Sequence, residues 1–168
     1  EEPEAHLHPQ YQNTFFEYLN ELQSKGLQVF VTSHSPTITA KSDVNNISIL
    51  QRKQSIIQSF SFDELSEDDY PKESKRHLRK FLDTTKAQLF FANGVLLVEG
   101  VAEAIIIPIL AKKFLTEKID LCKSGIELVN IGGVAFNHFG LLFNNDDERK
   151  RLLSKCAIIT DSDPKDNG

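Results

Sequence analysis

The chain has 168 residues, of which 40% are hydrophobic and 26% charged, and its formal net charge is −5. This length suits one ordinary domain or two small ones, and no apolar run approaches the ~20 residues that a membrane span needs. The negative charge excludes a global basic field of the kind that attracts nucleic acid, although a local site stays open. Cys122 and Cys156 lack the spacing of a metal site, so we expect reduced thiols in a cytoplasmic protein.

The ends of the sequence suggest a fragment. The chain contains no methionine, begins at EEPEAHLHPQ without a preceding strand, and stops at DSDPKDNG directly after an apolar run. The phosphate-binding pattern G-x-x-x-x-G-K-[ST] occurs nowhere in it. We therefore expect a piece of a longer protein that is cut at both ends.

The first forty residues predict two helices with a short strand between them. Apolar residues at spacings of three and four over 7–25 predict a helix, and Gly26 is a plausible end for it. Residues 28–32 predict a short buried strand. A turn follows, and Pro36 is well placed to open the next helix.

A hairpin, an acidic loop and a basic helix are predicted next. Residues 47–50 and 56–60 predict paired strands around a polar turn, and the acidic stretch 63–69 is expected to be a solvated loop. Within 72–93, basic side chains surround apolar ones, which predicts an amphipathic helix. The basic residues are Lys72, Lys75, Arg76, Arg79 and Lys80. Their side chains could bind the phosphates of a DNA backbone or form the solvated face of a connecting helix.

Strands and helices alternate regularly after Gly94. Apolar strands are predicted at 95–98, 126–131 and 157–160, with helices at 102–114 and 136–143. Continuous apolar strands that alternate with helices are typical of a parallel sheet covered on both faces.

Two of the three predicted strands end in acidic residues. Glu99 ends the first, and the third runs into Asp161 and Asp163. Ligands bind at the carboxyl ends of parallel strands, so we expect the strands that end at Glu99 and Asp161 to be neighbours or nearly so. Glu103 follows one helical turn after Glu99; it could face the same crevice or satisfy the amides at the helix N-terminus. Gly100 would leave room for substrate or metal.

Carboxylates that share one crevice repel one another strongly unless a cation lies between them. Hard divalent ions with oxygen ligands, Mg²⁺ or Mn²⁺, are the usual solution, and two such ions suit phosphoryl chemistry. The expected metal ligands are Glu99, Glu103, Asp161 and Asp163, of which Glu99, Asp161 and Asp163 are the expected catalytic residues.

LLVEGVAEA followed by AIITDSD resembles the Toprim domain of topoisomerases, primases and some nucleases. In that family a glutamate after the first strand and a D-x-D after a later strand hold the catalytic metals, which implies these roles for Glu99, Asp161 and Asp163. Glu103 and the segment NIGGVAFNHF resemble the OLD (overcoming lysogenization defect) nuclease branch.

EEPEAHLHPQ and QVFVTSHSP resemble the acid pair and the switch segment of ATP-binding-cassette ATPases. The resemblance implies that Glu1 orders Mg²⁺, that Glu2 is the catalytic base, and that His34 senses the γ-phosphate. His6 and His8 could be metal ligands, but a loop or interface role is the better interpretation.

The two resemblances together imply an α/β chain: the C-terminal part of an ABC-type ATPase core (1–62), a connecting region with a basic helix (63–93), and the N-terminal part of a parallel-sheet, Rossmann-like Toprim domain (94–168), both truncated. OLD proteins, including the nuclease of Gabija-type antiphage systems, join the two in this order. This order implies an ATP-regulated DNA endonuclease. Its expected cofactors are Mg²⁺ or Mn²⁺, with two ions at the Toprim site, and ATP at the ATPase domain. The expected partners are DNA, further copies of the intact protein and a helicase-like or defence-system protein. No association with a membrane is expected. An SMC-like ATPase or DNA-binding machine with a non-catalytic Toprim module is the alternative.

Overall fold

The computed structural model describes residues 2–114 and 120–161, and apart from the strand expected at 28–32 its main elements follow the predicted order. The helices are α1 (Pro9–Ser24), α2 (Pro36–Lys41), α3 (Lys72–Phe81), α4 (Thr84–Ala87), α5 (Val101–Phe114) and α6 (Phe136–Gly140). The strands are β1 (Ser48–Lys53), β2 (Ile56–Ser61), β3 (Gly94–Val98), β4 (Ile126–Asn130) and β5 (Lys155–Ile159). Short 3-10 turns are η1 (Val44–Asn46), η2 (Phe62–Glu64), η3 (Gln88–Phe90) and η4 (Glu148–Lys150). None of the helices in the described ranges has the length and apolar content to cross a bilayer.

The sheet that follows Gly94 is parallel, as predicted, with the order β4-β3-β5. β3 is the central strand, and every one of its residues except the half-buried Leu96 is buried. A parallel strand that is buried on both faces needs apolar side chains on both, which explains why β3 consists of apolar residues alone. The mixed α/β class is confirmed.

The expected cover on both faces of this sheet is incomplete within the described residues. α5 contains no buried residue, and on β5 the side chains of Ile158 and Ile159 are exposed. The sequence of α5 explains this difference, because the helix is apolar on every side and packing one side leaves the others open. Its exposed apolar residues are Val101, Ile105, Ile106, Ile109, Leu110 and Phe114.

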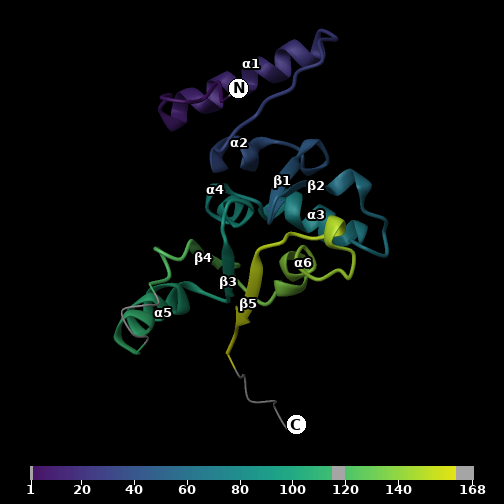
Figure 1. Ribbon diagram of the computed structural model, residues 1–168. Helices are drawn as coiled ribbons and strands as arrows, with labels where there is room; N and C mark the ends of the chain where they lie inside the picture. Colours follow the sequence, from purple (N-terminus) through teal and green to yellow (C-terminus); the bar gives the residue numbers. More distant parts are fainter. Residues whose placement is uncertain (1, 115–119, 162–168) are drawn as a thin grey trace, which may run out of the picture.

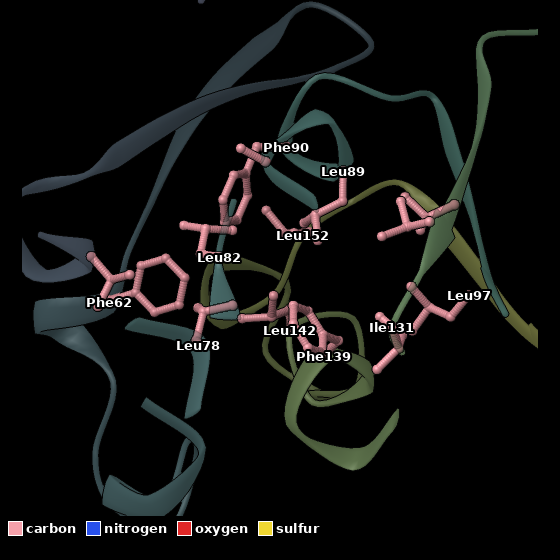
Figure 2. Packing of buried hydrophobic residues seen from close by; sticks show 14 of the residues in the cluster. Phe62, Leu78, Leu82, Leu89, Phe90, Leu97, Ile131, Phe139, Leu142 and Leu152 are labelled. Carbon is pink, nitrogen blue, oxygen red and sulfur yellow. The ribbon is translucent and has the colours of Figure 1, made fainter. Parts of the chain in front are cut away.

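One hydrophobic core joins the hairpin, α3, α4–η3, the sheet and α6. Figure 2 shows side chains from these separate elements in contact, from Phe62 on one side to Leu97 on the other. Phe62 packs edge-on against Phe60 at 5.1 Å, Tyr70 at 5.8 Å and Phe90 at 6.2 Å between ring centroids. Aromatic pairs in this geometry add stability beyond the area that they bury. The core holds the hairpin and the parallel sheet in one packed body.

The predicted hairpin is confirmed, and its turn lies at Gln54 and Ser55 because Lys53 pairs with Ile56. Gln54 has a φ of 55°, in the left-handed region that such turns require. The hairpin also binds the segment before β5: Gln51 donates to the carbonyl oxygen of Arg151 at 3.1 Å and accepts from the amide of Leu153 at 2.6 Å. These amide contacts fix β5 relative to the hairpin.

α1 ends as its sequence predicts. Gly26 has a φ of 86°, its amide donates to the carbonyl of Gln23 at 2.9 Å, and the amide of Leu27 donates to that of Leu22 at 3.2 Å. This pair of bonds is the Schellman arrangement, in which a left-handed glycine stops the helix. α1 lies at one end of the molecule, next to α2 (Figure 1).

The prediction of a buried strand at 28–32 is wrong. The segment is extended but exposed, with 85% of Phe30 accessible. Its one backbone bond to a distant part of the described chain runs from the amide of Glu2 to the carbonyl of Thr32, at 2.9 Å. An apolar run becomes a strand only when a neighbour completes its ladder, and no strand in 2–114 or 120–161 pairs with it.

The acidic stretch 63–69 is also not purely a solvated loop. Asp69 accepts hydrogen bonds from Lys150 at 2.7 Å, Asn145 at 3.0 Å and the Ser66 hydroxyl at 2.6 Å. These donors, Lys150 first, hold the pKa of the Asp69 carboxyl far below its usual range. The acidic stretch therefore attaches to the loop between α6 and β5.

Candidate functional sites

The first candidate site lies at the carboxyl end of β3. In the β3–β5 register Val98 lies opposite Ile159, so the next residues, Glu99 and Thr160, are neighbours. The Thr160 hydroxyl donates a hydrogen bond of 2.6 Å to Oε2 of Glu99. The expectation that the strands ending at Glu99 and Asp161 are neighbours is therefore confirmed.

The end of β4 borders Glu99 on its other side. The amide of Gly133 donates to the carbonyl oxygen of Glu99 at 2.9 Å, and the amide of Gly132 donates to the Asn130 side chain at 2.8 Å. Gly132 and Gly133 have φ values of 74° and 136°, and no atom lies within 4 Å of the place where either Cβ would be. This turn needs glycine for its backbone conformation, and it leaves the backbone open to close approach.

Glu103 caps the N-terminus of α5. Its Oε2 accepts a hydrogen bond from the Gly100 amide at 2.9 Å, which satisfies a donor that the helix leaves unpaired. A Cβ on Gly100 would lie 3.1 Å from this same oxygen. The Glu103 carboxylate thus lies where a side chain at position 100 would extend, and room there for substrate or metal stays a prediction.

The carboxylates at this edge fit a divalent metal in kind but not in number. Glu99, Glu103 and Asp161 offer the hard oxygen ligands that Mg²⁺ and Mn²⁺ prefer, and Asp161 is exposed at the end of β5. Asp163 lies outside the described residues. Within 2–114 and 120–161, no three Asp, Glu, His or Cys side chains are close enough together to hold a metal ion. The expected four-carboxylate cluster is therefore not formed by the described residues alone.

The second candidate site joins the start of the chain to the segment before α2. Nε2 of His34 lies 3.3 Å from Oε1 of Glu2, and the Glu2 amide donates to the carbonyl of Thr32 at 2.9 Å. Glu2 has a φ of 41°, a backbone conformation that residues other than glycine rarely adopt. The structure thus brings together two residues that the sequence proposes for one site. Glu1 lies outside the described residues.

Glu4 and Ser33 form a contact in this site that the sequence did not predict. Glu4 is only 6% exposed, and its Oε1 accepts a short hydrogen bond from the Ser33 hydroxyl. Ser33 directly precedes His34. The only sequence signal for this contact is the place of the two residues within EEPE and TSHSP.

The positions of His8 and His6 agree with the loop interpretation. His8 is the N-cap of α1, and its Nδ1 accepts from the Gln10 amide at 3.4 Å. His6 is exposed, with a φ of 69°. Neither belongs to a group of three possible metal ligands among the described residues.

Most of the basic residues of α3 already have partners within the chain. Arg76 is exposed, and Nζ of Lys80 lies 5.2 Å from the ring centroid of Phe81. The remaining contacts join Lys72 to Glu67, Lys75 to the carbonyl oxygen of Phe62 at 2.8 Å, and Arg79 to Asp43 at 2.9 Å. These contacts support a structural face for α3, and DNA binding by Lys75, Arg76, Arg79 and Lys80 stays a prediction.

The two candidate sites lie at opposite ends of the molecule. β3 and β5 run away from α1 and α2, so the strand ends that carry Glu99 and Thr160 are far from the segment of Glu2 and His34 (Figure 1). The hydrophobic core fills the space between them.

Comparison with known proteins agrees with both resemblances. Residues 90–163 match the family model for the overcoming lysogenization defect protein-like TOPRIM domain, and residues 1–39 match the AAA ATPase domain. Such segments imply binding of a divalent metal ion and of ATP.

Curated relatives match along most of the chain. The chain is 29% identical to the Old nuclease of Escherichia phage P2 over 161 residues, which covers 95% of this chain and 27% of the relative. It is 29% identical to Endonuclease GajA of Bacillus cereus (strain HuB5-5) over 184 residues, which covers 97% of this chain and 25% of the relative. It is 32% identical to the OLD nuclease of Thermus scotoductus (strain ATCC 700910 / SA-01) over 114 residues, 62% of this chain and 20% of the relative.

The chain thus spans about a quarter of the length of the first two relatives. An AAA ATPase match at its start and an OLD-like TOPRIM match at its end occur in one sequence. The chain is therefore similar to OLD-type nucleases along most of its length, with an AAA ATPase-like segment followed by an OLD-like TOPRIM segment.

Proposed function

We propose that the full-length protein is a DNA endonuclease that cleaves phosphodiester bonds at its TOPRIM site, depends on divalent metal and is regulated by ATP. The observation that carries this proposal is the position of Glu99 at the carboxyl end of the central strand, beside the strand end that leads into Asp161. The relatives of the chain bear the names nuclease and endonuclease.

The proposed ligands of two Mg²⁺ or Mn²⁺ ions are Glu99, Glu103, Asp161 and Asp163, with Glu99, Asp161 and Asp163 as the catalytic residues. Metal ions in such a site activate the attacking water and stabilise the leaving oxygen. The chain contributes by fixing the ligands. Thr160 orients the Glu99 carboxylate through its hydroxyl, and the open turn at Gly132–Gly133 leaves space for a phosphate backbone.

In the ATPase segment, Glu2 is the proposed catalytic base, His34 the residue that senses the γ-phosphate, and Glu1 the acid that orders Mg²⁺. The 3.3 Å contact between Glu2 and His34 supports this assignment. A base that activates the attacking water and a histidine that contacts the γ-phosphate must lie close together, and these two residues come from segments far apart in the sequence. The left-handed φ of Glu2 also supports a functional role, since strained residues cluster at active sites.

We infer that residues 1–62 belong to the ATPase part and residues 94–168 to the nuclease part, with 63–93 between them. The proposed partners are DNA, further copies of the full-length protein and a helicase-like or defence-system protein, in a cytoplasmic antiphage role. The relatives' names do not favour an SMC-like machine with a non-catalytic TOPRIM module, and neither does the presence of Glu99 and Asp161 at adjacent strand ends.

Cleavage of supercoiled plasmid by the full-length protein tests the nuclease. Glu99→Gln and Asp161→Asn keep the shape of each side chain but remove its charge, and each should reduce Mg²⁺- or Mn²⁺-dependent nicking to the level seen without metal. Asp68→Asn is the matched control, because Asp68 is exposed and lies in the acidic loop. Wild-type cleavage by either site variant would overturn the proposal.

A further inference from the structure

The buried carboxylate of Glu4 has no role in the mechanism above, yet it bridges the two segments of the ATPase site. Its Oε1 accepts the hydrogen bond from the Ser33 hydroxyl. Three other contacts link the same segments: Glu2 meets His34 at 3.3 Å, and the Glu2 amide donates to the carbonyl oxygen of Thr32 at 2.9 Å and to its hydroxyl at 3.3 Å. Of these four, the Glu4–Ser33 bond is the one made by a buried side chain.

A buried carboxylate is costly to keep unless it is bonded, because it loses its hydration. Glu4 is 6% exposed, and its second oxygen, Oε2, is buried without a partner among the described residues. The bond to Ser33 is therefore the main compensation that the described chain offers this group. Removing Ser33 would leave the whole carboxylate unpaired, whereas removing Glu4 would release the Ser33 hydroxyl.

The Ser33 hydroxyl both donates and accepts a hydrogen bond. It donates to Glu4 and accepts from the Ser35 amide at 2.9 Å. A hydroxyl that both donates and accepts has its rotamer fixed. Because Ser33 and Ser35 flank His34, the bond from the Ser35 amide to the Ser33 hydroxyl fixes the course of the backbone through His34, and the bond to Glu4 anchors it.

The residue after His34 is anchored as well. The Ser35 hydroxyl donates to Oε1 of Gln12, on α1, at 2.6 Å, and it caps α2 by accepting from the Ile38 amide at 3.4 Å. His34 itself has 83% of its side chain exposed. The histidine is thus an exposed side chain, in contact with Glu2, on a backbone that is held on both sides.

We propose that Glu4 is a positioning residue, which holds the His34 loop against Glu2 through the Ser33 hydroxyl. The proposal rests on the proposed ATPase function of Glu2 and His34. Glu4 touches no nucleotide in this role and acts only by fixing where the imidazole lies. A misplacement of about 1 Å in a catalytic group can cost up to about 100-fold in rate.

The test compares Glu4→Ala with Glu4→Gln in the full-length protein. Alanine removes the acceptor, so kcat for ATP should fall by between about 10-fold and 100-fold, while the affinity for a non-hydrolysable ATP analogue should stay the same. Glutamine keeps an acceptor oxygen for Ser33 and should restore most of kcat. Glu17→Ala, an exposed position on α1, is the control.

A double-mutant cycle of Glu4→Ala and His34→Ala distinguishes a positioning role of Glu4 from a general loss of structure. If Glu4 acts through His34, then Glu4→Ala should cause no further loss of kcat in a His34→Ala background. An equal loss in both backgrounds would overturn the proposal.

Hydrogen exchange provides a readout that does not depend on ATP hydrolysis. The Ser35 amide, which donates to the Ser33 hydroxyl, should exchange at least about 10-fold faster in Glu4→Ala than in wild type, because the loop loses its anchor. In Glu4→Gln this amide should stay protected. Unchanged exchange in Glu4→Ala would refute the positioning role whatever the kinetics show. Wild-type kcat in His34→Ala, together with faster exchange in Glu4→Ala, would instead refute the proposed ATPase role of His34 and leave the anchor established.

Discussion

The Thr160 hydroxyl donates a hydrogen bond of 2.6 Å to Oε2 of Glu99, from the end of β5 to the end of the neighbouring β3. This bond occupies one oxygen of the carboxylate and fixes its orientation, and no described residue donates to the other oxygen. A carboxylate held in this way presents its free oxygen in a constant direction, which is what a metal ligand needs.

Replacing Thr160 by valine tests this orientation, because valine keeps the branched shape at the end of β5 and removes only the donor. We expect the Mg²⁺ concentration for half-maximal cleavage to rise by between about 10-fold and 100-fold, the usual effect of losing a group that orients a metal ligand. Thr160→Ser keeps the donor and should behave like wild type. A Mg²⁺ titration followed by thermal stability gives the same comparison without DNA. An unchanged Mg²⁺ requirement in Thr160→Val would show that the bond has no role in the site.

Glu103 has a structural role that can be separated from any role as a metal ligand. Because its carboxylate accepts from the Gly100 amide at the start of α5, Glu103→Ala should lower the free energy of unfolding by about 0.3–1 kcal/mol even in EDTA. Glu103→Gln keeps an acceptor and should lose less. Urea unfolding in EDTA measures both. A variant that loses cleavage but keeps full stability in EDTA would instead mark Glu103 as a ligand alone.

A pair of stacked histidines predicts that stability falls in weak acid. The rings of His77 and His138 stack at 4.3 Å between centroids, and His77 also packs 4.4 Å from the ring of Phe81. Burial, and then the neighbouring His138, lower the pKa of His77 below its ordinary value of 6.5. The unfolded chain therefore binds a proton at a higher pH than the folded chain does. The stabilising contribution is present above pH 6.5 and is lost as the pH falls through that value to the lower folded-state pKa.

His77→Phe keeps a ring between His138 and Phe81 and cannot be protonated. The urea midpoint of this variant should change less between pH 7.5 and pH 5 than that of wild type. His6→Phe is the control, because His6 is exposed in a loop. Equal slopes of stability against pH in wild type and His77→Phe would contradict the prediction.

The sequence predicted the parallel strands because each is a continuous apolar run bounded by turn residues, and it predicted Glu99 as a strand-end acid for the same reason. It could not predict that β3 lies at the centre, because the order of strands depends on how the crossovers pack. The neighbouring ends of β3 and β5 were predicted, but the bond from Thr160 to Glu99 was not, because it depends on the register of the two strands.

The errors arise where long-range contacts decide the outcome. Asp69 lies in an acidic run that resembles a solvated loop, but its main partner, Lys150, is 81 positions away. Residues 28–32 have the pattern of a strand, but a strand forms only where a second strand pairs with it. Glu4 gave no pattern at all, since burial of a carboxylate depends on the packing around it.

The contact between Glu2 and His34 leads to the last prediction. In Glu2→Gln the side chain keeps its size beside His34, but it can no longer take the proton of an attacking water. The full-length variant should bind ATP with affinity near that of wild type and hydrolyse it no faster than the uncatalysed rate. Any effect of ATP on DNA cleavage should therefore persist with time in Glu2→Gln, while in wild type it fades as ATP is consumed. Phosphate release and plasmid cleavage measured in one reaction provide both readouts, with Glu17→Gln as the control. The 168-residue chain alone should not hydrolyse ATP, since its sequence holds no phosphate-binding loop. Sustained hydrolysis by Glu2→Gln would remove Glu2 from the role of catalytic base, and sustained hydrolysis by the 168-residue chain on its own would refute the ATPase assignment as a whole.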